Sequence, residues 1–329
     1  MVWIQFIVTA TILVFSAIQL AKYGDVIAIR TRLGGMFIGT LLLAAVTSLP
    51  EVLTTVSAVF QEAPNLAAGN LLGSNMFNMF LLAVLDIVHY KHRLLRKAAF
   101  KHALSGSLAM FISGLTAFFI LADIDIRIGW IGVDSLILLL VYMVAVRLIQ
   151  FNPLSPPISV SDEELPQGTP SLRHASIGFG LSGLVLVIVT PLMVQSSVRI
   201  AEITGLGTTF IGTTLVAIVT SLPELVTTLS AAHYGADDMA IGNLFGSNLF
   251  NMAALGLTDL FYLNGRFLSV IDANFVLVGL LGMIMTGMGL IGNLARLDRR
   301  LGILEIDSLL LILVYFGGMW FLYTQGISP

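Results

Sequence analysis

Two glutamates stand inside long apolar stretches, where an ionised side chain is least expected. Glu51 lies in GTLLLAAVTSLPEVLTTVSA and Glu224 lies in GTTLVAIVTSLPELVTTLSA, and neither stretch contains a lysine or an arginine. A carboxylate placed deep in hydrocarbon costs about 2.5–3.5 kcal/mol on membrane-insertion scales. Two such carboxylates without a basic partner favour the binding of cations or protons. The alternative is that each glutamate is protonated and only hydrogen-bonded.

Other oxygen-bearing residues surround each glutamate within one helical turn. A threonine, a serine and a helix-breaking proline precede it: Thr47, Ser48 and Pro50, and then Thr220, Ser221 and Pro223. Proline has no N–H and clashes with the preceding turn, so it frees carbonyl oxygens there. In hydrocarbon a freed carbonyl needs another partner, and a bound cation would serve. The alternative is an ordinary proline kink.

A second motif, GNLLGSNMFNM or GNLFGSNLFNM, follows each of the first. We expect its glycines, Gly69, Gly73, Gly242 and Gly246, to break the helix, because glycine lowers helix persistence and lets backbones approach. A serine and an asparagine four residues apart share one helix face in each copy: Ser74 with Asn78, and Ser247 with Asn251. The competing interpretation is a Gly-x-x-x-Gly helix-packing motif.

The composition places these motifs in a membrane. Of the 329 residues 57% are hydrophobic and 11% are charged, and the mean hydropathy is +0.96. This is more apolar surface than a water-soluble fold can hide. The net charge of −3 without a large basic patch argues against nucleic acid as a partner, and the absence of cysteine excludes disulfides and thiol catalysis.

The apolar runs predict an all-α polytopic protein with ten transmembrane helices. The expected spans are 2–22, 34–60, 64–88, 99–122 and 128–149, followed by 175–198, 207–232, 238–262, 267–293 and 301–324. The polar stretch 150–174 between the two sets, which contains Asn152-Pro153 and Pro156-Pro157, is typical of a linker.

The two sets are copies of one another. Segments 39–58 and 69–79 match 212–231 and 242–252, and every matched position, such as Glu51 and Glu224, differs by 173 residues. The chain therefore divides into repeats 1–149 and 175–329. Because five spans is an odd number, the repeats are predicted to have inverted topology, with a binding site at their interface.

Basic residues predict the orientation. With the N-terminus outside, only Arg127, Arg199 and Arg266 of the 16 lysines and arginines fall in outside loops. The positive-inside rule then places both termini outside and the 150–174 linker in the cytoplasm.

All candidate ligands are hard oxygens, which suits Ca²⁺ and Na⁺ better than Zn²⁺ or Cu²⁺. Competition of Ca²⁺ with two Na⁺ or two H⁺ for one pair of carboxylates is a sufficient basis for antiport. A cation channel would need an open pore, which dense proline-broken repeats disfavour. An enzyme is not expected, because no Ser–His pair or HExxH motif is present at membrane depth.

Together the paired motifs resemble the alpha-1 and alpha-2 repeats of the sodium/calcium exchanger family, in the calcium/cation antiporter superfamily. The resemblance covers nearly the whole chain and implies an antiporter that moves Ca²⁺ against Na⁺ by alternating access in the plasma membrane of a prokaryote. It implies no cofactor and no obligatory protein partner, and it makes spans one and six sliding gating helices. The implied ligands are Glu51, Thr47, Ser48, Ser74 and Asn78, then Glu224, Thr220, Ser221, Ser247 and Asn251, with carbonyls of Ala44 and Ala217.

This sequence departs from the family pattern at the end of the second motif. The family often has one aspartate there, which gives a third acid, whereas this chain has Asn251, with Asn78 in the first copy. Because this site has only two acids, the number of Na⁺ ions bound by the family cannot be assumed for this chain. A Ca²⁺/H⁺ exchanger stays open as the alternative. The short linker excludes the cytosolic Ca²⁺-sensing domains of the animal exchangers.

Overall fold

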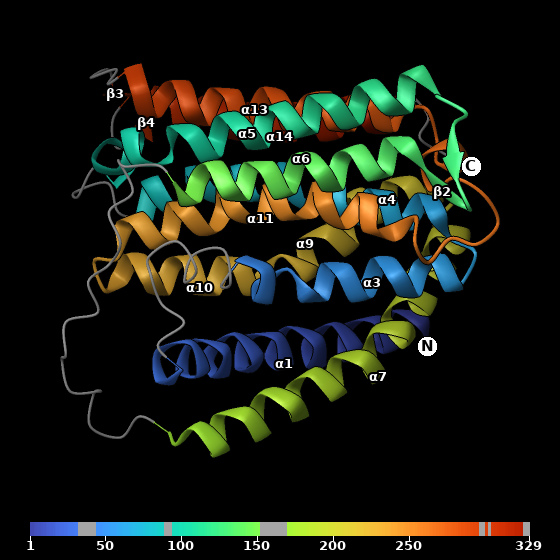
Figure 1. The fold of residues 1–329 in the computed structure, drawn as a ribbon, viewed down its shortest axis with the longest axis horizontal. Helices are drawn as coiled ribbons and strands as arrows, with labels where there is room; N and C mark the ends of the chain where they lie inside the picture. The colour runs from blue at the N-terminus through green and yellow to red at the C-terminus, as the bar shows by residue number, and fades with distance from the viewer. Residues whose placement is uncertain (32–43, 89–93, 152–169, 296–299, 302–303, 325–329) are drawn as a thin grey trace.

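The computed structural model describes residues 1–31, 44–88, 94–151, 170–295, 300–301 and 304–324. Within these residues the chain is mostly helical, and the long helices lie side by side (Figure 1). The first half contains α1 (Val2–Arg30), α3 (Leu49–Phe60), α4 (Pro64–Val88), α5 (Leu94–Ala122) and α6 (Val133–Gln150). The second contains α7 (Leu172–Thr204), α8 (Gly207–Ile211), the π-helix η1 (Gly212–Val216), α9 (Ala217–Thr220), α10 (Leu222–His233), α11 (Asp237–Thr258), α12 (Phe267–Val270), α13 (Phe275–Ala295) and α14 (Ile306–Thr324).

Several of these helices have the length and composition of membrane spans, which makes this an integral membrane protein. Seven described segments qualify: Val2–Ile27, Pro64–Val88, His102–Ala122, Val133–Gln150, Leu172–Thr204, Gly207–His233 and Ile306–Thr324. Leu49–Phe60 and Phe275–Ile291 are apolar but shorter. The 22-residue α11, at the predicted span 238–262, is absent from the seven despite its length. Its asparagines, serine and aspartates lower its hydropathy.

Two predicted span starts are wrong because short hairpins precede the helices. Strand β1 (Arg127–Ile128) pairs antiparallel with β2 (Ile131–Gly132), and β3 (Arg300–Leu301) pairs likewise with β4 (Leu304–Glu305). Helices α6 and α14 therefore begin after the expected residues 128 and 301. A hydropathy scan counts apolar residues and cannot distinguish an apolar hairpin from the first turn of a helix.

Other boundaries also differ from the expected ones. Helix α1 continues past residue 22, and the span expected at 267–293 is divided into α12 and α13. Residues 34–43 of the second expected span and residues 152–169 of the linker lie outside the described part of the chain.

Helices α4 and α11 are the most buried elements, and α1 with α7 forms an outer layer. Most residues of α4 and α11 are shielded from the surface. Helix α1 packs along α7 at one edge of the molecule, and this pair contacts the rest mainly through α3, α8, α9 and α10 (Figure 1). Glycine and asparagine are poor helix formers in water. Inside a membrane protein α4 and α11 stay helical because every backbone polar group must find its partner within the protein.

Candidate cation site

The helix that carries each glutamate is interrupted three residues before it. Ser48 has φ −87° and ψ 6°, Ser221 has φ −88° and ψ 4°, and α3 and α10 begin at the next residue. Pro50 and Pro223 occupy the first turn of the new helices, where a missing N–H costs nothing. The glutamates follow in the same first turn, where the helix dipole favours negative charge.

Each glutamate accepts a hydrogen bond from the serine of the opposite repeat. Ser48 Oγ donates to Glu224 Oε1 at 3.0 Å, and Ser221 Oγ donates to Glu51 Oε1 at 3.0 Å. All four side chains are fully buried. Neither glutamate forms an ion pair with any described residue. The two predicted motifs therefore meet at one buried place.

Contacts between threonines and asparagines also connect the two repeats. Thr220 Oγ1 lies 2.9 Å from Asn70 Oδ1, and Thr47 Oγ1 lies 3.4 Å from Asn243 Oδ1. The Asn70 amide also donates to the backbone oxygen of Glu51 at 3.0 Å. These contacts hold the interrupted helices against α4 and α11.

The carbonyl oxygens of Ala44 and Ala217 already have partners in this structure. Ala44 O accepts from the Ser48 N–H at 3.0 Å and from the Thr47 hydroxyl at 3.2 Å. Ala217 O makes the equivalent bonds with its own serine and threonine at 3.1 and 3.2 Å. A cation that used either carbonyl would have to compete with a hydrogen bond.

The second motif does not interrupt its helices, so that prediction is wrong for Gly69, Gly73, Gly242 and Gly246. Helices α4 and α11 run through these positions without a break. A Cβ atom at Gly73 would lie 2.3 Å from Thr213 O, and one at Gly69 would lie 2.8 Å from Thr213 N. These two glycines therefore let α4 approach the backbone of η1, which is the packing interpretation.

Eight buried side-chain oxygens have no hydrogen-bond partner among the described residues, and six of these eight form three symmetry-related pairs. The six are Glu51 Oε2, Ser74 Oγ and Asn78 Oδ1, with Glu224 Oε2, Ser247 Oγ and Asn251 Oδ1. Buried polar atoms normally have a hydrogen-bond partner, so six unpartnered oxygens at matching positions need an explanation. A Ca²⁺ ion takes six to eight oxygen ligands, and Na⁺ also prefers oxygen, so this donor set fits a hard cation.

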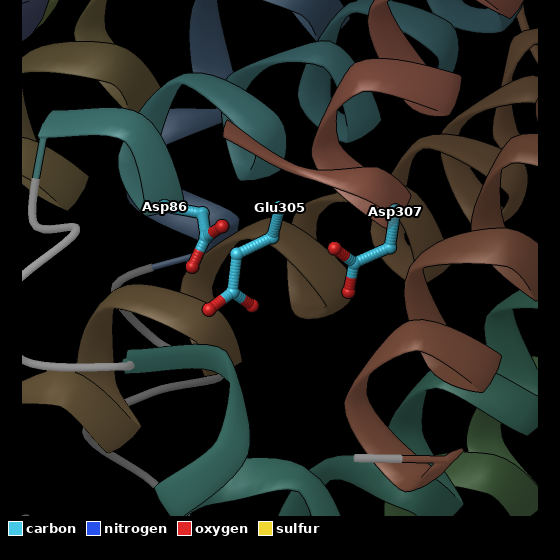
Figure 2. A group of neighbouring side chains, drawn as sticks. All are labelled: Asp86, Glu305 and Asp307. Atoms are coloured by element: carbon cyan, nitrogen blue, oxygen red, sulfur yellow. The ribbon is translucent and has the colours of Figure 1, made fainter. Parts of the chain in front are cut away.

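A separate acidic group lies at one end of α4. Asp86, Glu305 and Asp307 bring carboxylate oxygens within 4.8 Å of one another (Figure 2). Ser308 Oγ donates to Asp86 Oδ2 at 2.7 Å, and each of the three carboxylates makes further interactions. Asp86 is about 18 Å along the helix axis from Ser74, so this group is distinct from the candidate cation site.

The counterpart of this group in the other repeat is an arginine-centred cluster. Arg266, which is 3% exposed, lies 3.2 Å from Asp134 Oδ2 and also pairs with Asp123. Asp259 accepts backbone N–H groups of Gly132 and Phe267. This cluster joins the loops at the ends of α5 and α11.

Four asparagines of the site were not among the predicted ligands. Asn70, Asn243, Asn75 and Asn248 lie in the second motif and are buried. Their positions within the duplicated motif were visible in the sequence, but each of them also makes a contact that reaches across to the other repeat. No local spacing rule reveals such contacts.

Comparison with known proteins agrees with the family that the paired motifs resemble. The family model described as "Sodium/calcium exchanger protein" matches residues 1–150 and 174–324. The sodium/calcium exchanger MaX1 of Methanosarcina acetivorans is 51% identical over 83 residues, which cover 25% of this chain and 24% of MaX1.

Two solved structures share the fold over almost the whole chain. The sodium-calcium exchanger NCX_Mj superposes with a TM-score of 0.60 at 22% identity, covering 97% of this chain and 99% of that one. The H⁺/Ca²⁺ exchanger CAX superposes with a TM-score of 0.64 at 15% identity, covering 99% and 89%. The fold is therefore common to exchangers driven by different ions.

Proposed function

The chain belongs to the sodium/calcium exchanger family, and we propose that it exchanges Ca²⁺ for Na⁺ across the membrane by alternating access. The observation that carries the proposal is the set of six buried, unpartnered oxygens on the paired motifs. Two of them belong to carboxylates, which a divalent cation or two monovalent cations would neutralise. The substrates are inorganic cations, and the protein acts as a transporter rather than an enzyme.

We assign the ligands from the same motifs. Glu51 and Glu224 bind Ca²⁺ directly, and hydroxyl and amide oxygens complete the Ca²⁺ and Na⁺ shells. These oxygens come from Thr47, Ser48, Ser74 and Asn78, and from Thr220, Ser221, Ser247 and Asn251. The carbonyls of Ala44 and Ala217 contribute when their hydrogen bonds to the nearby threonines are released.

Sodium is favoured over protons as the driving ion by the neutral oxygens of the site. A proton needs only a carboxylate oxygen, whereas a metal ion needs several oxygens at once. Four of the six unpartnered atoms are hydroxyl or amide oxygens. The 51% identity with part of MaX1, whose name describes a sodium/calcium exchanger, supports the same choice.

A Ca²⁺/H⁺ exchanger is the second candidate, and one feature favours it. Asparagines at 78 and 251 leave the site with two carboxylates, and two protons could replace one Ca²⁺ there. The fold is shared with CAX, so it is compatible with either driving ion.

We further propose ten spans in two inverted five-helix repeats, 1–149 and 175–329, joined by a cytoplasmic 150–174 linker. In a prokaryotic plasma membrane both termini would then lie outside. Figure 1 supports an even number of spans, because α1 begins at the same end of the molecule at which α14 finishes. The scarcity of basic residues in the predicted outside loops supports the orientation.

Uptake of ⁴⁵Ca²⁺ into proteoliposomes tests the proposal directly. With an outward Na⁺ gradient we expect uptake by the purified protein, and none with an outward H⁺ gradient. Uptake driven only by H⁺ would overturn the Na⁺ assignment in favour of the second candidate. Absence of uptake with either gradient would contradict cation exchange itself.

Glu51→Gln and Glu224→Gln test the central ligands. Glutamine keeps an oxygen to accept the hydrogen bond from the opposite serine, but it removes the charge. We therefore expect an inserted, folded protein without Ca²⁺ uptake. Glu62→Gln is the matched control, because Glu62 is exposed in the loop after α3. Retained uptake in either buried variant would remove the central claim.

A further inference from the structure

Four asparagines join α4 to α11 where the two helices cross. Asn75 Nδ2 donates to the backbone oxygen of Asn248 at 3.2 Å, and Asn248 Nδ2 donates to the backbone oxygen of Asn75 at 3.2 Å. Asn78 Nδ2 donates to Asn248 Oδ1 at 3.0 Å, and Asn251 Nδ2 donates to Asn75 Oδ1 at 3.1 Å. We call these four residues the asparagine lattice.

The asparagine lattice fixes the direction of each amide group. A backbone carbonyl can only accept, so Asn248 must turn its NH₂ group towards Asn75 and its oxygen towards Asn78. Asn78 must then offer its own NH₂ group, and its oxygen is left without a partner. In the same way, Asn75 turns its NH₂ group towards the backbone oxygen of Asn248 and its own oxygen towards Asn251. Asn251 must then donate its NH₂ group, and its oxygen is left without a partner.

An aspartate at position 78 or 251 would not fit this arrangement. An ionised carboxylate has no N–H to donate, so it would face the oxygen of Asn248 or Asn75 without a hydrogen bond. The asparagine lattice therefore favours neutral amides at both positions, including position 251, where the resembled family often has an aspartate. The site keeps only two negative charges, from Glu51 and Glu224.

We propose that the asparagine lattice makes the exchange electroneutral, with two monovalent ions moved for each Ca²⁺. This inference rests on the proposed function. One Ca²⁺ or two monovalent cations neutralise the two carboxylates. A third monovalent cation would leave an uncompensated positive charge in a fully buried site, which is strongly disfavoured. The charge balance is the same whether the monovalent ion is Na⁺ or H⁺.

The test measures the Ca²⁺ ratio at which net flux through the full-length protein in proteoliposomes is zero. The membrane potential is clamped with K⁺ and valinomycin, and the Na⁺ ratio, or the H⁺ ratio if protons drive uptake, is varied. We expect the Ca²⁺ ratio to follow the square of the monovalent-ion ratio and to be independent of potential. A cycle carrying one net charge would instead shift the Ca²⁺ ratio about 50-fold for 100 mV.

A pair of variants tests whether the asparagine lattice sets this stoichiometry. Asn251→Asp adds a carboxylate to the site, and we expect it to bind a further monovalent cation and to become sensitive to potential. Asn65→Asp is the matched control, because Asn65 lies outside the site at the start of the neighbouring helix α4. Asn65 Oδ1 accepts the backbone N–H of Asp272 at 2.8 Å, a bond that aspartate keeps, so electroneutral exchange should persist.

The outcomes separate this inference from the proposed function. Ca²⁺ flux with a cubic ion dependence and a potential-dependent end point would overturn electroneutrality and leave the exchanger intact. Potential-independent exchange by a folded Asn251→Asp variant would overturn the role of the asparagine lattice. Absence of Ca²⁺ flux in the unmodified protein would overturn both proposals. If Asn251→Asp does not fold, the unmodified protein alone decides the stoichiometry.

Discussion

At the scale of single residues, each carboxylate depends on a hydroxyl from the other repeat. Ser48 holds Glu224, and Ser221 holds Glu51, at the same distance of 3.0 Å. The site is therefore complete only when the two repeats are packed together. A substitution in one motif should therefore weaken ion binding by the residues of both motifs.

Ser48→Ala and Ser221→Ala should each lower the apparent affinity for Ca²⁺. Each removes a hydroxyl that orients a buried carboxylate. A hydrogen bond to a charged group contributes roughly 1.5–3 kcal/mol, which corresponds to about 10- to 150-fold in affinity. The measurement is the Ca²⁺ concentration dependence of ⁴⁵Ca²⁺ uptake.

Ser113→Ala is the control for these serine variants. Ser113 is also buried in a helix, but its hydroxyl donates to Ala109 O of its own helix at 2.8 Å. Its affinity for Ca²⁺ should be unchanged. Equal affinities in all three variants would mean that the serine–glutamate bonds do not contribute to binding.

At the scale of elements, α4 is positioned by its close approach to η1. The first glycine pair of the second motif leaves room for the backbone at Thr213. The π-helix η1 widens the helix at this point, immediately before α9 and the interruption at Ser221. Close packing of α4 on η1 thus helps to fix the position of the second glutamate motif.

Gly73→Ala should destabilise the protein and reduce uptake. The new methyl group would lie 2.3 Å from Thr213 O, so the backbone of η1 would have to move. Overpacking of this kind costs about 1–3 kcal/mol. Thermal unfolding in detergent should show a lower midpoint for this variant.

Gly317→Ala in α14 is the matched control, because no atom of the described residues lies within 4 Å of a Cβ atom there. Its unfolding midpoint should stay the same or rise, since alanine favours helix over glycine. Equal midpoints for the two variants would refute the close-packing explanation.

At the scale of the whole molecule, α1 and α7 form a pair that lies outside the rest of the bundle (Figure 1). Described contacts between this pair and the site helices include the Gln61 amide, which donates to Pro191 O at 3.0 Å. Gly24 of α1 also lies against Val46, just before the first interruption. If α1 and α7 slide as gating helices, these contacts must change during transport.

Cross-linking tests this movement, and the chain has no native cysteine to interfere. A short bifunctional thiol reagent on Gly24→Cys with Val46→Cys should stop uptake, because it ties α1 to the site. The same reagent on Leu20→Cys with Gly183→Cys joins α1 to α7 within the pair and should leave uptake intact. A Cβ atom at Gly183 lies 3.5 Å from Leu20.

The comparison is made within each double variant, with and without the reagent and after its reductive removal. Full uptake by the cross-linked Gly24–Val46 variant would show that α1 does not move against the site. Loss of uptake in both variants would point to movement between α1 and α7 themselves.

Much of this protein could be predicted from one sequence because the informative signals are local or periodic. Apolar runs predicted a helical membrane protein, and the constant offset of 173 residues paired Glu51 with Glu224. The paired motifs predicted the exchanger family, which the family model confirms. The hairpins before α6 and α14 were missed, since hydropathy alone does not distinguish them from helical turns.

What the tertiary structure decided is how the two copies meet. The sequence by itself placed a serine, a glutamate and several asparagines in each repeat, but it could not show that Ser48 bonds Glu224 rather than a residue of its own repeat. It also left open whether the glycines break a helix or admit a neighbouring backbone. Both answers depend on contacts between residues more than a hundred positions apart, and such contacts exist only once α4, α11 and the interrupted helices are packed together.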